Sequence, residues 1–153
     1  MFWKAVKNPF QLERPAARSL SSIWIKQVND DYGHDAGDAV LCQVADLFRS
    51  NLRADDVVAR MGGEEFVIAL SRGTARETWN VAQRLREAVE QKVFQYDEQE
   101  MRLTISLGIV RYDFDENLES AMRKADLLTY QSKKDGRNRI SCNEGQFGLQ
   151  PAV

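Results

Sequence analysis

The chain has 153 residues, enough for one domain with its own core, and its 43% hydrophobic and 29% charged residues are typical of a globular protein. A net charge of -2 argues against nucleic acid or an anionic membrane surface as a bulk electrostatic partner. No apolar stretch is long enough to cross a bilayer, and Cys42 and Cys142 lack metal-ligand spacing. We therefore expect no membrane segment, no secretory signal and a cytoplasmic protein with reduced thiols.

The first 25 residues are poorly patterned. Asn8-Pro9 and Arg14-Pro15 interrupt regular structure, and serines weaken the strand-like run from Ser19 to Ile25. We expect an irregular or degraded first-strand region over residues 1–25, one domain over 26–142, and a frayed C-terminal tail over 143–153.

A polar segment with two glycines, residues 26–38, leads into an amphipathic helix. The apolar residues of that helix recur at helical spacing: Val40, Leu41, Val44, Leu47, Phe48 and Leu52. On the residues alone, the polar segment is a loop that caps the helix. The charged residues Arg53 to Asp56 follow the helix and, on the same grounds, form a solvated loop.

Two strand-like runs, residues 57–61 and 66–70, flank Gly62, Gly63, Glu64 and Glu65. Glycine reaches positive φ without steric cost, so this pattern predicts a β-hairpin whose bare tip allows a phosphate to approach. Adjacent strand residues point to opposite faces, so we expect the two carboxylates to have different roles. A simple surface turn remains the alternative.

Four more elements complete a domain of class α+β, in which helices pack on a mostly antiparallel sheet. Thr74 and Glu77 form a capping box at the start of a helix. The elements after it are a strand over residues 103–109, a helix capped by Asn117 that ends near Lys133 and Lys134, and a last strand over residues 137–142.

Gly62-Gly63-Glu64-Glu65-Phe66 resembles the signature of the GGDEF family, the diguanylate cyclases, in its GGEEF form. Three further segments resemble family motifs in the expected order: Lys26 to Asp38, Thr104 to Gly108, and Tyr130 to Asn138. The resemblance covers roughly residues 26–141. It implies a central sheet like that of nucleotidyl cyclases and polymerase palms. It also implies a homodimeric enzyme that joins two GTP into cyclic di-GMP and releases pyrophosphate.

The resemblance also implies roles for individual residues. Glu64 and Glu65 would be catalytic and would bind Mg²⁺ (or Mn²⁺), which takes oxygen ligands. Asn29 and Asp38 would hydrogen-bond guanine, whose donors and acceptors match an amide and a carboxylate. The triphosphate would be held by Lys26, Gly62, Gly63, Lys133 and Arg137. Lysines at a helix C-terminus also serve simply as partners of the helix dipole.

Arg53 and Asp56 match the family's inhibitory site for the product cyclic di-GMP. A guanidinium can bind phosphate or guanine acceptors in bidentate fashion, and a carboxylate can accept from guanine donors. Arg84 lies where the family has a second arginine of that site. A solvated helix residue is the alternative for Arg84.

One departure from the family concerns the strand before Lys26. The family has Asp-x-Asp there and its first aspartate binds metal, whereas this chain has Ser21 and Ile23. The family's Asp-Pro-Leu-Thr-Gly opening is also missing, so the domain is interpreted as N-terminally truncated or altered. Two functions follow: a cyclase with impaired activity, or a degenerate domain that binds GTP or cyclic di-GMP as an effector.

The genetic code suggests an origin for this departure. Trp24 must be TGG and Ile25 begins with AT, so a frame set back by one nucleotide reads GAT, aspartate, across the two codons. If Ser22 is TCG, its last base and the AT of Ile23 give a second GAT. The hypothesis is an out-of-frame reading up to about Ile25, with a compensating small deletion before Lys26. It predicts a poorly formed first strand.

Overall fold

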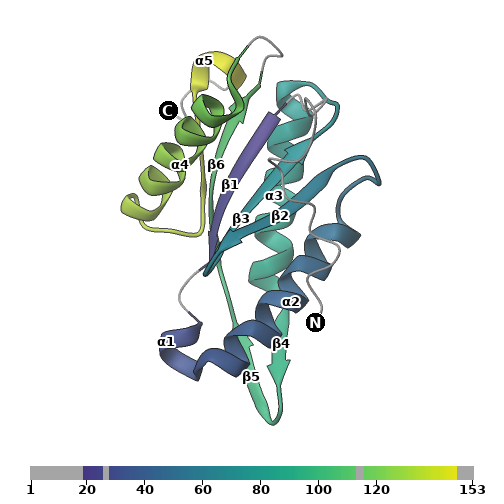
Figure 1. Ribbon diagram of the computed structural model, residues 1–153, viewed down its shortest axis with the longest axis vertical. Helices are drawn as coiled ribbons and strands as arrows, with labels where there is room; N and C mark the ends of the chain where they lie inside the picture. Colours follow the sequence, from purple (N-terminus) through teal and green to yellow (C-terminus); the bar gives the residue numbers. More distant parts are fainter. Residues whose placement is uncertain (1–18, 26–27, 113–115, 148–153) are drawn as a thin grey trace.

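The computed structural model describes residues 19–25, 28–112 and 116–147 (Figure 1). The strands are β1 (Ser19–Ile25), β2 (Val57–Gly62), β3 (Glu65–Leu70), β4 (Val93–Tyr96), β5 (Gln99–Arg102), β6 (Ile105–Arg111) and β7 (Ile140–Cys142). The helices are α1 (Asn29–Tyr32), α2 (His34–Ser50), α3 (Ala75–Gln91), α4 (Leu118–Lys134) and α5 (Glu144–Phe147).

Five of the strands form one sheet in the order β2-β3-β1-β6-β7. Every pairing in it is antiparallel except that of β6 with β7. β1 is the central strand and pairs along its length with β3 on one side and β6 on the other. The fold is therefore the predicted α+β class with a mostly antiparallel sheet and helices on both faces.

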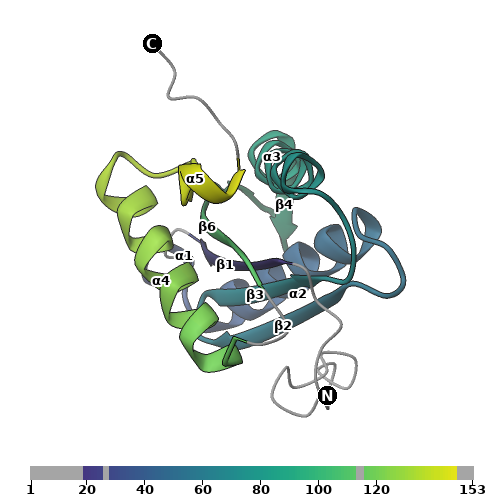
Figure 2. The same ribbon diagram turned by 90° about the horizontal axis from the view of Figure 1, so that it is seen from above.

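The helices cover the two faces of this sheet unequally (Figure 2). The larger core lies between the sheet and α2 and α3, where Phe48 of α2 meets Phe66 of β3 edge to face at 5.6 Å between ring centroids. The smaller core lies under α4, where Ala121 and Ala125 pack against Ala69 and Val110. The small alanines of α4 allow that helix to lie close to the strands.

The sequence predicts an irregular region up to Ile25, whereas Ser19–Ile25 is a regular strand, so that prediction is wrong for the described part of the region. The serines are tolerated because Ser19 Oγ hydrogen-bonds Thr78 Oγ1 of α3 at 3.1 Å and the neighbouring strands complete the backbone ladder. The poorly formed first strand that the out-of-frame hypothesis predicts is also absent. Residues 1–18 lie outside the described residues.

Two further predictions near the C-terminus need correction. The predicted tail contains the short helix α5, and its Phe147 is 5% exposed and belongs to the larger core. The predicted last strand begins only at Ile140, because Arg137 and Asn138 have φ values of 63° and 48°, which no strand adopts.

The β4–β5 hairpin is not predicted from the sequence. It forms a separate two-stranded sheet that extends beyond the end of the main sheet (Figure 1), with Asp97 at φ 52° in its turn. Charged and amide residues dominate it, so it lacks the apolar alternation that marks a strand. No helix within the described residues is long and apolar enough to cross a membrane.

Candidate functional site

The predicted hairpin consists of β2 and β3, and its turn is formed by Gly63 and Glu64. Gly63 has φ 52°, a left-handed conformation that favours glycine. A Cβ built on Gly62 or Gly63 would meet no other atom within 4 Å. The tip is therefore open backbone that a ligand can approach closely.

The two glutamates at the tip have different surroundings. Glu64 is half-buried, and its Oε1 accepts a hydrogen bond from the backbone N–H of Val28 at 2.8 Å. Its carbonyl oxygen accepts from the Ile25 N–H at 3.1 Å. Glu65 is exposed and opens β3 directly opposite Trp24 of β1. Glu64 thus ties the tip to the segment after β1, and Glu65 presents its carboxylate to solvent.

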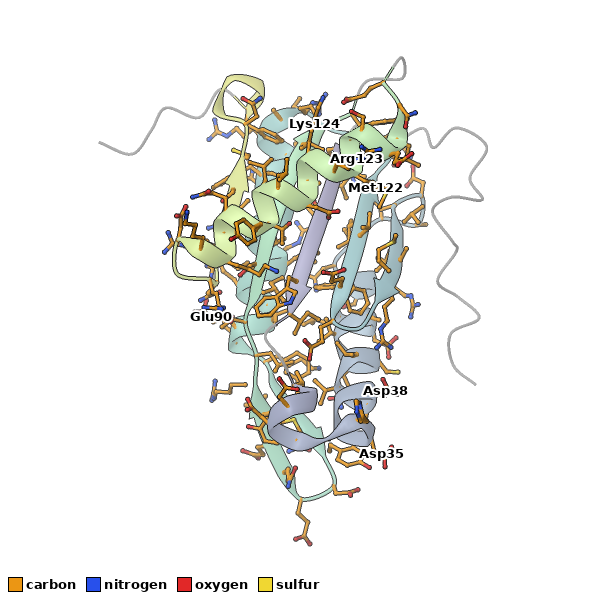
Figure 3. The ribbon with its side chains drawn as sticks, turned by 60° about the vertical axis from the view of Figure 1, so that its left-hand side comes forward. Asp35, Asp38, Glu90, Met122, Arg123 and Lys124 are labelled. Atoms are coloured by element: carbon orange, nitrogen blue, oxygen red, sulfur yellow. The ribbon has the colours of Figure 1, made fainter. Side chains whose placement is uncertain are left out.

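Asp38 lies in the first part of α2 on an exposed face (Figure 3). Its Oδ1 is 3.5 Å from a guanidinium nitrogen of Arg60, whose Nε also donates to the carbonyl of Gly63 at 2.8 Å. The Arg60 side chain is mostly buried, at 17% exposed, while that of Asp38 is 67% exposed. Arg60 therefore fixes Asp38 to the hairpin tip.

Lys133 and Arg137 reach the same region from the end of α4. Lys133 Nζ lies 4.8 Å from the centroid of the Trp24 ring, and the Arg137 guanidinium carbon lies 5.7 Å from it. Trp24 neighbours Glu65 in the sheet, so both cations stand at the base of the hairpin tip. Neither makes an ion pair with any described residue.

The loop that carries Arg137 has an unusual backbone. Gly136, Arg137 and Asn138 all have positive φ, at 116°, 63° and 48°. Asn138 holds the loop against α3, because it accepts from Arg86 at 3.0 Å and donates to Glu90 at 2.7 Å. Glu90 lies where the end of α3 approaches this loop (Figure 3). The hydrogen bonds from Arg86 and Asn138 hold the pKa of the Glu90 carboxyl below its usual value.

Lys26 lies outside the described residues. Asn29 begins α1, but its side chain also lies outside the described part. The helix that carries Asn29 precedes α2, the helix of Asp38, with only Gly33 between them.

The tip offers two carboxylates to a metal ion. Among the described residues there is no group of three or more histidine, cysteine, aspartate or glutamate side chains that could hold one. Mg²⁺ is commonly bound by one or two carboxylates together with waters and substrate phosphates. Glu64 and Glu65 therefore fit an ion that arrives with a triphosphate, and they do not form a complete cage by themselves.

The three residues predicted to form the inhibitory product site come together at the opposite end of the hairpin. Arg53, Asp56 and Arg84 line a pocket of about 290 Å³, with Arg72 and Glu77 also in its wall. Ligand pockets run from about 300 to 1,000 Å³, so this one suits part of a larger ligand, such as one base with a phosphate.

The hydrogen bonds of this pocket restrict its charged groups. Asp56 Oδ2 accepts from the Arg53 N–H at 3.0 Å and Oδ1 accepts from the Ser71 N–H at 3.0 Å, so Asp56 also braces its own loop. Arg84 donates to the carbonyl of Asn51 at 2.6 Å. Arg72 pairs with Asp55 outside the predicted set, and its guanidinium holds the Asp55 pKa below the usual value. The Arg53 guanidinium, unlike that of Arg84, makes no hydrogen bond or ion pair with another described residue.

Sequence reasoning missed three residues of the site region. Arg60 directly precedes the Met61-Gly62 pair, and its position two residues before the glycines is a usable signal for a residue that holds the tip. Asn138 follows a glycine and an arginine, and asparagine tolerates the left-handed conformation. Trp24 gave no such signal, because its role depends on which strands lie beside β1.

The family model and the relatives that match this chain are all described as diguanylate cyclases. The family model described as "Diguanylate cyclase, GGDEF domain" matches residues 24–139. Diguanylate cyclase A of Treponema denticola is 43% identical over 125 residues, which cover 81% of this chain and 34% of that protein. Diguanylate cyclase DosC of Escherichia coli is 35% identical over 116 residues, which cover 75% of this chain and 25% of that protein. The chain thus spans about a third or less of these two relatives.

Two solved structures of similar fold are also described as GGDEF or GGEEF domains. The GGDEF domain of DgcB from Caulobacter crescentus, in complex with c-di-GMP, matches with a TM-score of 0.75 and 28% identity over 81% of this chain and 74% of that one. The active GGEEF domain of a diguanylate cyclase from Vibrio cholerae matches with a TM-score of 0.68 and 31% identity over 81% of each chain.

Proposed function

The chain belongs to the GGDEF family of diguanylate cyclase domains, and on this premise we propose that it binds GTP at the β2–β3 hairpin tip and joins two GTP molecules into cyclic di-GMP. The observation that carries the proposal is the convergence at the tip of two carboxylates, an open glycine backbone and two cations, Lys133 of α4 and Arg137 of the loop after it. These groups suit a metal-bound triphosphate.

In this reaction the 3′-hydroxyl oxygen of one GTP attacks the α-phosphorus of the other, and pyrophosphate leaves. The same step repeated in the opposite sense closes the ring. Each domain holds one GTP, so two copies must face each other, and we propose a homodimer for turnover. Cys42 and Cys142 are not joined in a disulfide, which supports a reducing compartment such as the cytoplasm.

We assign the following roles. Glu64 and Glu65 would hold the divalent ion, Mg²⁺ or Mn²⁺, which when bound lowers the charge of the triphosphate and activates the attacking oxygen. Gly62 and Gly63 would lie against the phosphates, and Lys26, Lys133 and Arg137 would neutralise them. Asp38 and Asn29 would read the guanine edge, with Arg60 positioning Asp38.

We further propose that turnover by this chain is weak. The described residues provide two carboxylates at the tip, and the aspartate of the family's first strand has no counterpart in Ser19–Ile25. Phosphoryl transfer depends on positioning and on charge stabilisation, so loss of a metal ligand should lower the rate of the chemical step more than it lowers binding.

A turnover assay tests the proposal. Purified protein is incubated with GTP and Mg²⁺ or Mn²⁺, and cyclic di-GMP and pyrophosphate are measured by chromatography and a coupled assay. Slow, metal-dependent formation of both products is expected. If neither product forms and GTP does not bind, the proposal is rejected.

A second candidate is a domain that binds cyclic di-GMP without making it. The pocket of Arg53, Asp56 and Arg84 favours this function, because it combines guanidinium groups with a carboxylate acceptor for guanine. Binding of cyclic di-GMP in calorimetry, together with no turnover of GTP, would select this candidate over the enzyme.

A further inference from the structure

Trp24 lies beside the hairpin tip in the sheet, and the role proposed for it rests on the proposed function of that tip. Glu65 of β3, Trp24 of β1 and Ser106 of β6 are direct neighbours in a row across three strands. Antiparallel partners that lie opposite each other point to the same face of a sheet. This row therefore lies on the face that α4 covers, beneath the end of α4 that carries Lys133.

Lys133 near the end of α4 and Arg137 in the loop after it both lie over the indole ring of Trp24. Lys133 Nζ is 4.8 Å and the Arg137 guanidinium is 5.7 Å from the ring centroid, within the range of cation–π attraction. Lys133 is half-buried at this position. Arg137 is held there by a loop that Asn138 fastens to α3. The strand β1 therefore holds the Trp24 ring in place, and the loop after α4 holds Arg137 over it.

Lys133 and Arg137 lie over the Trp24 indole, and we propose that this ring competes with a nucleotide triphosphate for the two cations. A triphosphate must take the same two cations, and a hydrophobic ring on the strand beneath them offers it no hydrogen bond. Trp24 is thus the residue that makes the phosphate subsite of this chain weak. The missing carboxylate of the first strand is a separate defect.

The structure also distinguishes Trp24 from Ser21, the position that sequence spacing assigns to the missing aspartate. Ser21 is 4% exposed and pairs with Ile68 and Ile109 on the face that α2 and α3 cover. A carboxylate there would be buried in the larger core, on the opposite face from the exposed Glu65. A carboxylate at position 24 would lie beside Glu65 and beneath the two cations.

The first experiment uses inorganic tripolyphosphate, which carries no base, as the probe in calorimetry. Trp24→Val and Trp24→Leu remove the ring face while keeping an apolar residue that suits a strand. Each should bind tripolyphosphate about tenfold more tightly than the wild type, the gain expected from releasing two cation–π contacts. Adding Lys133→Ala to either variant should cancel the gain. Trp79→Phe, a change to a tryptophan of α3 outside the tip, should leave the affinity unchanged.

Equal or weaker binding by a folded Trp24→Val or Trp24→Leu protein would overturn the proposal, since the ring would then support the subsite or be neutral. Two variants are used so that failure of one to fold, judged by circular dichroism, leaves the test intact. A gain that persists in the double variant with Lys133→Ala would also overturn it.

The second experiment tests position 24 against position 21 without any nucleotide. Mn²⁺ binding is measured by electron paramagnetic resonance for Trp24→Asp and Ser21→Asp. Trp24→Asp should bind Mn²⁺ at least about tenfold more tightly than the wild type, because it adds a carboxylate beside Glu65. Ser21→Asp should give no gain and should lower the melting temperature. No gain from Trp24→Asp, or a gain from Ser21→Asp, would overturn the placement.

These readouts separate the inference from the proposed function. If GTP is turned over but the Trp24 variants leave tripolyphosphate affinity unchanged, the inference alone fails. If the Trp24 variants bind tripolyphosphate more tightly while no variant makes cyclic di-GMP or prefers GTP to ATP, the proposed function alone fails.

Discussion

Gly108 of β6 lies directly against Thr129 of α4: a Cβ built on Gly108 would stand 2.3 Å from the Thr129 backbone nitrogen and 2.2 Å from the carbonyl oxygen of Ala125. The atoms that it would meet are backbone atoms, which cannot rotate away. The glycine of the Thr-Ile-Ser-x-Gly strand therefore sets the distance between helix and sheet.

Gly108→Ala should lower the free energy of unfolding by at least about 2 kcal/mol, because α4 must move away from the sheet to admit the methyl group. Urea denaturation followed by circular dichroism measures this change. Gly145→Ala is the matched control, because its Cβ would meet only the Asn143 side chain at 3.6 Å, an ordinary contact. Equal stability of the two variants would show that α4 is not held at this distance.

Two substitutions of Glu64 should separate the effect of its charge on turnover from the effect of its hydrogen bond on stability. Glu64→Gln keeps an oxygen that accepts from the Val28 N–H, so its stability should stay within about 0.5 kcal/mol of wild type while metal-dependent turnover is lost. Glu64→Ala leaves the N–H of the buried Val28 without this acceptor and should cost about 1–2 kcal/mol. Urea denaturation and the turnover assay measure the two effects.

Glu65→Ala is the control for stability, because Glu65 is exposed and its side chain makes no hydrogen bond within the described residues. Its free energy of unfolding should match that of the wild type. Undiminished cyclic di-GMP formation by Glu64→Gln would remove the metal-binding role from Glu64.

Arg53→Ala should weaken binding of cyclic di-GMP by at least about tenfold, because a guanidinium in the 290 Å³ pocket is lost as a charge-assisted donor. Arg49→Ala is the matched control: Arg49 pairs with Asp46 on α2 and does not line the pocket. Calorimetry on the three proteins measures this. Equal affinity of wild type and Arg53→Ala, or no binding by either, would reject the product site.

The capping box of α3 should make the stability of the folded protein depend on pH. Hydrogen bonds from the Thr74 backbone and side chain hold the Glu77 pKa below its usual 4.5. The folded-state pKa is lowered, so the stabilisation is present above about pH 4.5 and is lost as pH falls through the lower folded-state value. Thr74→Ala should reduce this pH dependence, because the hydroxyl is lost while the backbone N–H of residue 74 still donates to the Glu77 carboxylate, and it should also lower stability at neutral pH. Thermal melts of both proteins at several pH values from neutral down to about pH 3 test this; identical pH profiles would contradict it.

The DNA sequence tests the origin of β1. If residues up to about Ile25 are read out of frame, Ser22 should be TCG, and the frame set back by one nucleotide should read GAT twice before Lys26. Sequencing the gene decides this directly. A Ser22 codon other than TCG would reject the double aspartate reading. The regular β1 contradicts the poorly formed first strand that this hypothesis predicts, so the codons decide whether the hypothesis survives.

Sequence reasoning predicts the elements whose signals are local. The hairpin around Gly62 and Gly63, the Thr74 capping box and the Asn117 cap are all confirmed, because glycine conformation and capping depend on a few neighbouring residues. The apolar face predicted for the helix after residue 38 is confirmed for Val40, Leu41, Val44 and Phe48 of α2, which are all buried.

Elements that depend on distant partners are missed. β1 has a weak strand pattern of its own and exists because β3 and β6 flank it, so its serines mislead a local argument. Phe147 is buried only because α5 returns to the larger core. The relation of Trp24 to Lys133 requires the sheet register, which no local pattern contains.

The central position of β1 has a consequence for how the chain acquires its fold. Its first residue, Ser19, pairs with Leu70 on one side and with Arg111 on the other, so the middle of the sheet consists of contacts between residues far apart in the chain. Such a high contact order slows folding, because loops must close before those contacts form. During synthesis β1 leaves the ribosome long before β6. Until β6 emerges, the backbone donors and acceptors on the β6 side of β1 have no strand partner. A nascent chain of this domain should therefore need protection from aggregation until β6 has emerged.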